Sequence, residues 1–262
     1  MEWYQYLIAI LGSALAGGIN TLAGNGSVIT LSILTEWVGL PGNVANASNR
    51  VGIFTQNLAG GYVFYKKGKL DFSRSGDLII LTSIGAIAGT WVAVVVSSGQ
   101  FMSVFRVLMV VMLFVILFNP ERWLRETDVD FRLPTWITWV LFLALGFYGG
   151  FIQMGMGVFF LAIMVLGARY SIIEANAVKI IIVGIYTLLA ILIFQWKGLI
   201  DWRAGLLMAV GQSAGGYFTA IFASQYPKAN VWAHRVLVVI VVFSVITMFR
   251  LDEWILNLIQ QW

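Results

Sequence analysis

The chain has 262 residues, of which 60% are hydrophobic and only 11% charged, and its mean hydropathy is +0.88. A soluble domain carries roughly 25% charged residues, so this composition excludes an ordinary water-soluble fold and indicates a membrane protein. The formal net charge of +4 is modest, and the basic residues are scattered at segment ends rather than gathered in a nucleic-acid-binding patch. The absence of cysteine excludes disulfides, thiolate metal sites and cysteine-based catalysis.

Ten apolar segments, separated by polar or charged breaks, predict helices along the chain. They span residues 3–22, 27–38, 43–65, 75–96, 101–118, 134–153, 157–166, 171–196, 202–222 and 231–249. Eight of them approach the roughly 20 residues that cross a bilayer, whereas 27–38 and 157–166 are too short. Tryptophan and tyrosine gather at the segment ends, as they do at membrane interfaces. The sequence therefore predicts an all-α polytopic membrane protein with eight long helices and two short or broken ones.

The two halves of the chain share short motifs in the same order. Gly18, Gly24 and Gly26 return as Gly149, Gly155 and Gly157; residues 45–47 return as 175–177, 67–72 as 197–202, 85–89 as 211–215 and 106–108 as 235–237. The offset stays near 130 residues, which indicates a duplication. We predict a first membrane repeat at 1–118, a connecting loop at 119–133 and a second membrane repeat at 134–262, with about four to five helices in each repeat. Because the first motif recurs inside the chain, we expect the first segment to be mature structure rather than a cleaved leader.

Charge does not decide how the two repeats are oriented. If each short segment completes a broken crossing, the repeats are parallel; if it re-enters or crosses separately, they are inverted. The positive-inside rule scores both arrangements equally, because the basic residues of the second half divide three and three between the two sides. Inverted repeats with discontinuous helices recur among transporters, so we favour the inverted arrangement.

The first candidate site is a polar break between two helices, together with its copy in the second half. It comprises Asn20, Gly24, Asn25, Gly26 and Ser27, and in the copy Gln153, Gly155 and Gly157. A helix that starts at Ser27, with Ser27 as a candidate cap, leaves free N–H groups in its first turn. Such a start inside the membrane would bind an anion through the helix dipole. The alternative is close helix packing or a plain interfacial loop.

The second candidate site is a polar helix face that also occurs in both halves. It comprises Asn46, Asn49 and Arg50, with Asn176 and Lys179 as the counterparts. Residues three apart share a helix face, and a cation inside a membrane helix usually faces a cavity or a partner. Arg50 and Lys179 would then bind the substrate or provide a counter-charge. The alternatives are snorkelling to the interface and structural pairing with Glu174 or Glu36. Gln56 and Asn57 continue the face, with Gln212 and Ser213 in the second half.

Other residues point to structural roles. Asp71 and Asp201 precede helices and are expected to cap them or to pair within loops, and His234 is expected to lie at an interface. The sequence contains no catalytic triad, phosphate-binding loop, zinc spacing or haem motif. We therefore expect no enzymatic activity, no catalytic residue, no metal site and no cofactor.

The order of these motifs resembles the TauE/SafE sulfite-exporter family of duplicated membrane permeases. The likeness rests on GGINTLAGNGS, ANASN and KKGKLDF, repeated as GGFIQMGMG, EANAVK and KGLIDW, and extends from about Leu7 to Phe249. It implies a multi-pass plasma-membrane (inner-membrane) carrier for sulfite, thiosulfate, an organosulfonate or a small carboxylate, with both candidate sites lining its path. Met154 and Met156 interrupt the richer glycine run usual in the family, which puts a symmetric site in doubt and allows a larger or less polar substrate.

We therefore predict a secondary transporter of a small anion, with that anion and the lipid bilayer as its partners and no nucleic acid. One alternative is an anion channel on the same scaffold. Another is a carrier of a cation or a neutral solute, but the absence of a membrane-centred carboxylate disfavours a cation path. Glycine pairs such as Gly85/Gly89 and Gly211/Gly215 fit a homodimer interface as well as packing within one chain.

Overall fold

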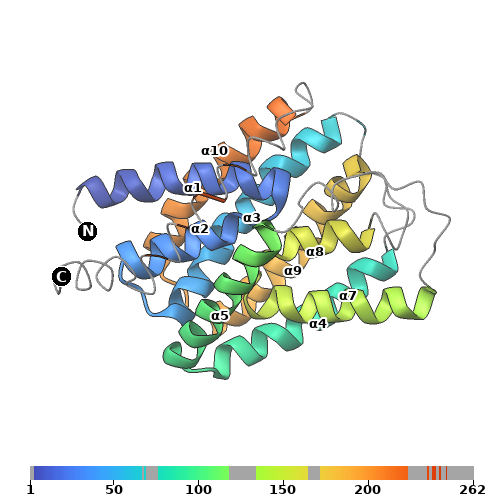
Figure 1. The fold of residues 1–262 in the computed structure, drawn as a ribbon, viewed down its shortest axis with the longest axis horizontal. Helices are drawn as coiled ribbons and strands as arrows, with labels where there is room; N and C mark the ends of the chain where they lie inside the picture. The colour runs from blue at the N-terminus through green and yellow to red at the C-terminus, as the bar shows by residue number, and fades with distance from the viewer. Residues whose placement is uncertain are drawn as a thin grey trace, which may run out of the picture.

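The computed structural model describes residues 3–66, 68, 76–117, 134–164 and 172–223, together with residues 235, 238, 239, 242 and 246. Within these ranges the chain is helical (Figure 1). The helices are α1 (Trp3–Ala23), α2 (Gly26–Ser32), which continues into a π-helical segment (Ile33–Trp37), α3 (Gly42–Lys66), α4 (Gly76–Val95), α5 (Ser98–Leu117), α7 (Thr135–Phe151), α8 (Met156–Ala162), α9 (Ile172–Trp196) and α10 (Trp202–Ala223). The predicted all-α fold is confirmed for this part of the chain, including the two short helices.

Several predicted features lie outside the described residues. The connecting loop 119–133 is one of them. Of the predicted helix 231–249 only isolated positions are described, and of the 67–72 motif only Gly68. Asp71, His234 and the side chain of Glu174 are also outside the described residues.

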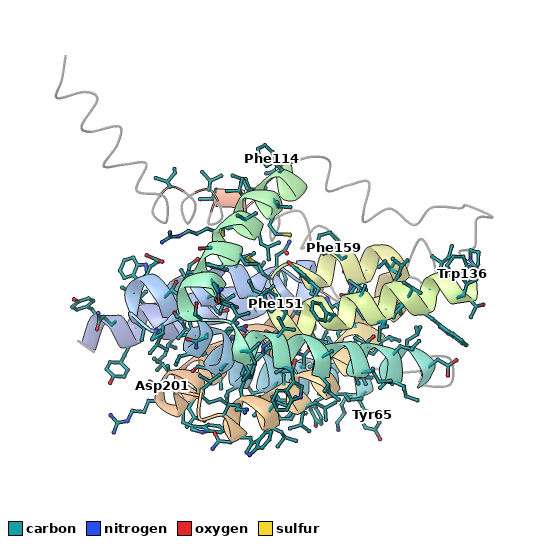
Figure 2. The ribbon with its side chains drawn as sticks, turned by 90° about the horizontal axis from the view of Figure 1, so that it is seen from below. Tyr65, Phe114, Trp136, Phe151, Phe159 and Asp201 are labelled. Atoms are coloured by element: carbon teal, nitrogen blue, oxygen red, sulfur yellow. The ribbon has the colours of Figure 1, made fainter. Side chains whose placement is uncertain are left out.

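The outer surface of the described helices is apolar. Among the described residues, Gly76–Val95 and Ala175–Trp196 are long and apolar enough to cross a bilayer. Only 39% of the first of these stretches is buried, and large apolar side chains such as Ile80 and Ile84 are exposed on it. Side chains project outward along the helices in Figure 2. Lipid tolerates such a surface, whereas water would drive it to associate.

Four glycines bring two pairs of long helices into close contact, α4 with α7 and α10 with α1. A Cβ atom at any of them would overlap the backbone of the facing helix: Gly85 and Gly89 meet Leu143 and Phe147 in α7, and Gly211 and Gly215 meet Ile10 and Ala14 in α1. Small residues permit this approach where lipid supplies no hydrophobic force between helices. These glycine pairs therefore pack within one chain.

The two short helices, α2 and α8, lie between these two pairs of long helices. Figure 1 shows α2 and α8 between the α1/α10 pair and the α4/α7 pair. All seven residues of α2 are buried. Both helix breaks therefore lie in the interior of the described part of the molecule, between the two pairs of long helices.

Candidate functional site

The two predicted helix breaks meet through their backbones. The Gly157 N–H donates to the Gly24 carbonyl oxygen at 3.3 Å. A Cβ atom on either glycine would overlap the Cα atom of the other. Gly24 also has φ +73°, in the left-handed region that favours glycine. The packing interpretation therefore accounts for these two glycines.

The second break has an unusual backbone. Gly155 precedes α8 with φ +69°, and Gln153, two residues earlier, has φ +59°. Among the described residues, Gln153 is the non-glycine residue with positive φ. Such a conformation costs of order 1–3 kcal/mol and persists where the surroundings hold it in place.

The first break differs from the prediction at its capping residue. Helix α2 begins at Gly26 and is preceded by Asn25, whose side chain makes no cap hydrogen bond. Ser27 therefore lies within the first turn, where it is buried, and the prediction that it caps the helix was wrong. The left-handed turn at Gly24 lets the helix start one residue earlier. Gly26 is needed for packing, because a Cβ atom there would overlap the Ala16 carbonyl oxygen.

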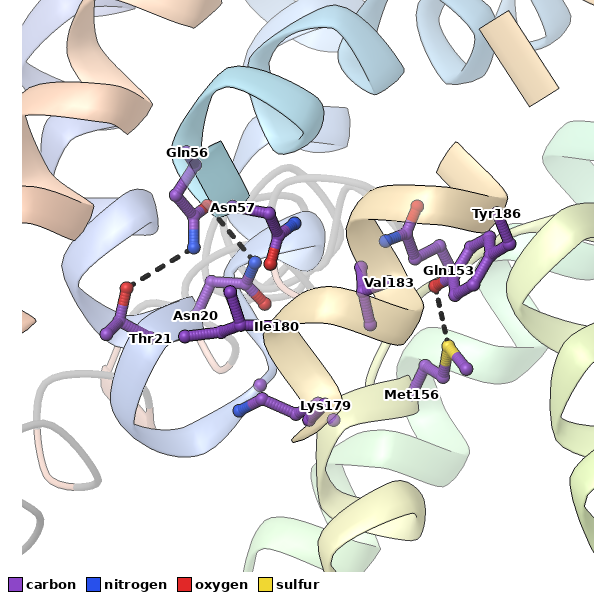
Figure 3. Close-up of a pocket in the computed structure, with 12 residues that line it drawn as sticks. Asn20, Thr21, Gln56, Asn57, Gln153, Met156, Lys179, Ile180, Val183 and Tyr186 are labelled. Atoms are coloured by element: carbon purple, nitrogen blue, oxygen red, sulfur yellow. Dashed lines mark hydrogen bonds between the residues drawn. The ribbon is translucent and has the colours of Figure 1, made fainter. Parts of the chain in front are cut away.

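A polar pocket lies beside the contact between the two breaks (Figure 3). It is lined by Asn20, Thr21 and Gly24, by Gln56 and Asn57 of α3, by Gln153, Met156 and Gly157, and by Lys179, Ile180, Val183 and Tyr186 of α9. Its cavity volume is about 20 Å³, which is room for roughly one water molecule. A larger solute therefore requires the lining side chains to move apart.

Five of the predicted site residues line this pocket, and the others do not. The five are Asn20, Gly24, Gln153, Gly157 and Lys179. The prediction missed Thr21, Met156, Ile180, Val183 and Tyr186, and it placed Gln56 and Asn57 on the polar face without including them in the site. Val183 and Tyr186 follow Lys179 by four and seven residues, so the helical period places them on the same face of α9.

Lys179 is a buried cation with no carboxylate beside it in the part of the chain that the structure describes. It is only 4% exposed, which rules out snorkelling. Its Nζ donates to Asn176 Oδ1 at 2.8 Å. The described carboxylates are those of Glu36, Asp77 and Asp201, and none of the three lies on α9, whereas the side chain of Glu174 in the first turn of α9 is outside the described residues. A buried charge is costly unless it is paired, and an anion in the pocket would pair with it.

Hydrogen bonds join the α1 and α3 sides of the pocket. Asn20 Nδ2 donates to Gln56 Oε1 at 3.1 Å, and Gln56 Nε2 donates to Thr21 Oγ1 at 3.3 Å (Figure 3). Both ends of the Gln56 amide are thus occupied. On the α9 side, the Tyr186 hydroxyl donates to Met156 Sδ at 2.7 Å.

Arg50 is fully buried but does not line the pocket. Its guanidinium donates to the Gly149 carbonyl oxygen at 2.6 Å, to the Gly150 carbonyl oxygen at 2.9 Å, to Asn46 Oδ1 at 3.3 Å and to Gln153 Oε1. These carbonyls belong to the last turn of α7, where the helix leaves its acceptors unused and its dipole favours a cation. Both snorkelling and pairing with Glu36 are therefore wrong for Arg50.

Asn46 and Asn49 of α3 form hydrogen bonds with two different helices. Asn46 Nδ2 donates to the Phe151 carbonyl oxygen at 2.9 Å, whereas Asn49 Oδ1 accepts from Gln212 Nε2 of α10 at 3.1 Å. Their spacing puts them on one side of α3, but the structure uses them to attach two other helices. The expectation for Asp201 is confirmed, because its Oδ1 accepts from the Ala204 N–H at 3.0 Å and so caps α10.

The described residues contain no group of three or more His, Cys, Asp or Glu side chains that could hold a metal ion. The pocket presents amide groups, the Thr21 and Tyr186 hydroxyls, one ammonium and backbone to a solute. The ammonium and the amide N–H groups are donors of the kind that bind an anion.

Comparison with known proteins places the chain among membrane transporters. The family described as "Sulfite exporter TauE/SafE" matches residues 9–248. A "Probable membrane transporter protein ORF9" of Sinorhizobium sp is 26% identical over 230 residues, covering 86% of this chain and 85% of the relative. A "Probable membrane transporter protein" of Xylella fastidiosa (strain 9a5c) is 22% identical over 245 residues, covering 91% of this chain and 93% of the relative. No solved structure gives a match.

Proposed function

Because this chain belongs to the sulfite exporter TauE/SafE family and is a membrane transporter, we propose that it is a secondary carrier of a small anion. The proposed substrates are sulfite, thiosulfate, an organosulfonate or a small carboxylate. The proposed location is the inner (plasma) membrane, which the chain crosses several times.

The observation that carries this proposal is Lys179 at the polar pocket. The ammonium is buried, its hydrogen bond goes to a neutral amide, and no carboxylate is among the described residues that line the pocket. Neither a cation nor a neutral solute would offer this ammonium a counter-charge. An anion would gain a charge-assisted hydrogen bond from it.

The proposal includes two inverted repeats, 1–118 and 134–262. Reciprocal packing supports the duplication: α4 packs on α7 as its counterpart α10 packs on α1, through glycines at equivalent positions. Helix direction supports the inversion. In Figure 1, α1 begins at the left beside the N-terminus, whereas α7 runs from Trp136 at the right towards Phe151 near the centre in Figure 2.

The test uses purified protein in detergent and in proteoliposomes. We expect thermal stabilisation by one class of anion among sulfite, thiosulfate, methanesulfonate and acetate, and loss of that stabilisation in Lys179→Ala. Saturable uptake with counterflow would identify a carrier, and ohmic current would identify a channel instead. Stabilisation by cations or neutral solutes alone would overturn the anion assignment.

A further inference from the structure

Gln153 combines three properties that the proposed transport function alone does not explain. It is only 5% exposed, it lines the pocket, and it holds a left-handed backbone conformation although it is not glycine. Its side chain lies beside Val183 and Tyr186 in Figure 3. Its Oε1 accepts a hydrogen bond from Arg50 Nη1.

The Arg50 contact fixes which way the Gln153 amide points. A guanidinium carries only hydrogen-bond donors, so the atom of Gln153 that faces it must be the carbonyl oxygen. The amide NH₂ group is then directed away from Arg50. An amide with no such neighbour could present either its oxygen or its nitrogen to a solute.

Arg50 is itself held firmly enough to do this. The carbonyl oxygens of Gly149 and Gly150 accept from its two terminal nitrogens. The Gln153 N–H donates to the Tyr148 carbonyl oxygen at 3.2 Å. The end of α7, the guanidinium and Gln153 thus form one hydrogen-bonded unit, which accounts for the persistence of the strained backbone.

The other amides of the pocket each use a donor within the protein. Asn20 donates to Gln56, Gln56 donates to Thr21, and Asn57 donates to the Ile53 carbonyl oxygen at 2.7 Å. Within the described part of the chain, Gln153 Nε2 makes no such bond. Among the amides that line the pocket, Gln153 is therefore the one whose NH₂ group has no acceptor in the described part of the chain.

We infer that Gln153 Nε2 is an anion-binding donor of the pocket and that Arg50 is its positioning residue. Arg50 binds Oε1 and so turns the NH₂ group towards the anion, without touching the anion itself. This inference rests on the proposed function, because it names a second ligand of the same anion.

The decisive variant is Gln153→Glu, which has nearly the same shape. One carboxylate oxygen stays on Arg50 as a charge-assisted pair, so the variant folds. The other oxygen replaces the donor by a negative charge, and like charges in contact cost several kcal/mol, so affinity for the anion falls by roughly 100-fold or more. Gln153→Ala removes the donor without adding charge and weakens binding by roughly 10- to 100-fold, as expected for one hydrogen bond to a charged group. Gln195→Glu, on an exposed residue of α9, is the control for added charge.

The positioning role is tested by measuring KM for uptake in a double-mutant cycle. Arg50→Lys should raise KM in the wild-type background, because an ammonium holds Oε1 less rigidly than the planar guanidinium. In the Gln153→Ala background it should leave KM unchanged, since no amide remains to be oriented. A purely structural role would produce the same fold-change in both backgrounds, and that result would overturn the assignment of Arg50.

The outcomes separate this inference from the proposed function. Binding is read as thermal stabilisation of each purified variant by sulfite, thiosulfate, methanesulfonate and acetate. If no anion stabilises the wild type, the proposed function fails. If an anion stabilises the wild type and stabilises Gln153→Glu to the same extent, the pocket still binds an anion, but Gln153 is not one of its ligands. If Gln153→Glu does not fold, Gln153→Ala decides, and stabilisation of that variant by the anion equal to that of the wild type overturns the inference.

Discussion

Arg50 Nη1 donates to the Gly149 carbonyl oxygen at 2.6 Å. A cation of α3 thus caps the C-terminal end of α7, although the two residues are 99 positions apart in the chain. Lys179, in the second half, instead lies at the pocket and donates to Asn176 of its own helix. Two buried cations of one fold thus have different roles. Arg50 binds the carbonyl oxygens at the end of α7, whereas Lys179 lines the pocket.

Arg50→Met should chiefly destabilise the fold. The change leaves the Gly149 carbonyl oxygen and Gln153 Oε1 without the Arg50 donor, whereas the Gly150 carbonyl oxygen still accepts from Thr90 Oγ1 at 3.3 Å. Each buried acceptor left without a donor costs about 1–3 kcal/mol. We expect a lower melting temperature and a lower yield of folded protein, measured by fluorescence-detected size-exclusion chromatography with a thermal ramp. A melting temperature equal to that of the wild type would contradict this role.

Lys179→Met should impair transport and leave the stability of the fold intact. Removing a buried ammonium that lacks a carboxylate partner among the described residues should leave stability unchanged or raise it. Uptake of the anion should fall at least roughly 30-fold, because one side of a buried charge pair is lost. Radiolabelled sulfite and thiosulfate uptake into proteoliposomes measures this effect.

The control for Lys179 is Lys66→Met, which removes an exposed lysine at the end of α3. Its uptake should match that of the wild type. If Lys179→Met also transports normally, the pocket is not the anion site.

Gly24→Ala and Gly157→Ala should each disrupt the contact between the two helix breaks. An added Cβ atom would overlap backbone, which cannot move aside as a flexible side chain can, and Gly24 in addition has positive φ. Each substitution should destabilise the protein by about 1–3 kcal/mol, measured as loss of thermal stability.

Gly99→Ala provides the matched control for these two variants. Gly99 lies in α5, and a Cβ atom there meets nothing within 4 Å. Alanine favours a helix over glycine by up to about 1 kcal/mol, so this variant should be as stable as the wild type or more stable. Equal tolerance at Gly24, Gly157 and Gly99 would mean that the breaks are not in contact.

The sequence predicted the helices and the breaks because those features depend on local patterns. Apolar length and glycine position gave the boundaries of α9 and α10 within one residue of the structure. The polar face of α3 was also correct as a set of buried positions. Local patterns were sufficient for these features because every helix in lipid must satisfy its own backbone.

The assignment of roles within the site could not be made from the sequence. The partners of Arg50 include backbone carbonyls, and an acceptor on the backbone leaves no trace in residue identity. Asn46 and Asn49 share a spacing, yet they bind different helices, because three-dimensional packing decides which neighbour each one meets. Tyr186 was detectable only through its seven-residue spacing from Lys179.

The inverted arrangement of the two repeats makes a prediction about labelling from each side of the membrane. Lys66 lies at the end of α3, and Lys197 follows directly after α9, the equivalent helix of the second half. Both side chains are exposed, and the chain has no cysteine, so Lys66→Cys and Lys197→Cys each introduce a single thiol. In inverted repeats, a membrane-impermeant maleimide added to intact cells or to inside-out vesicles should label the two variants from opposite sides. Labelling of both from the same side would establish parallel repeats, and the proposed two-fold relation would then be wrong.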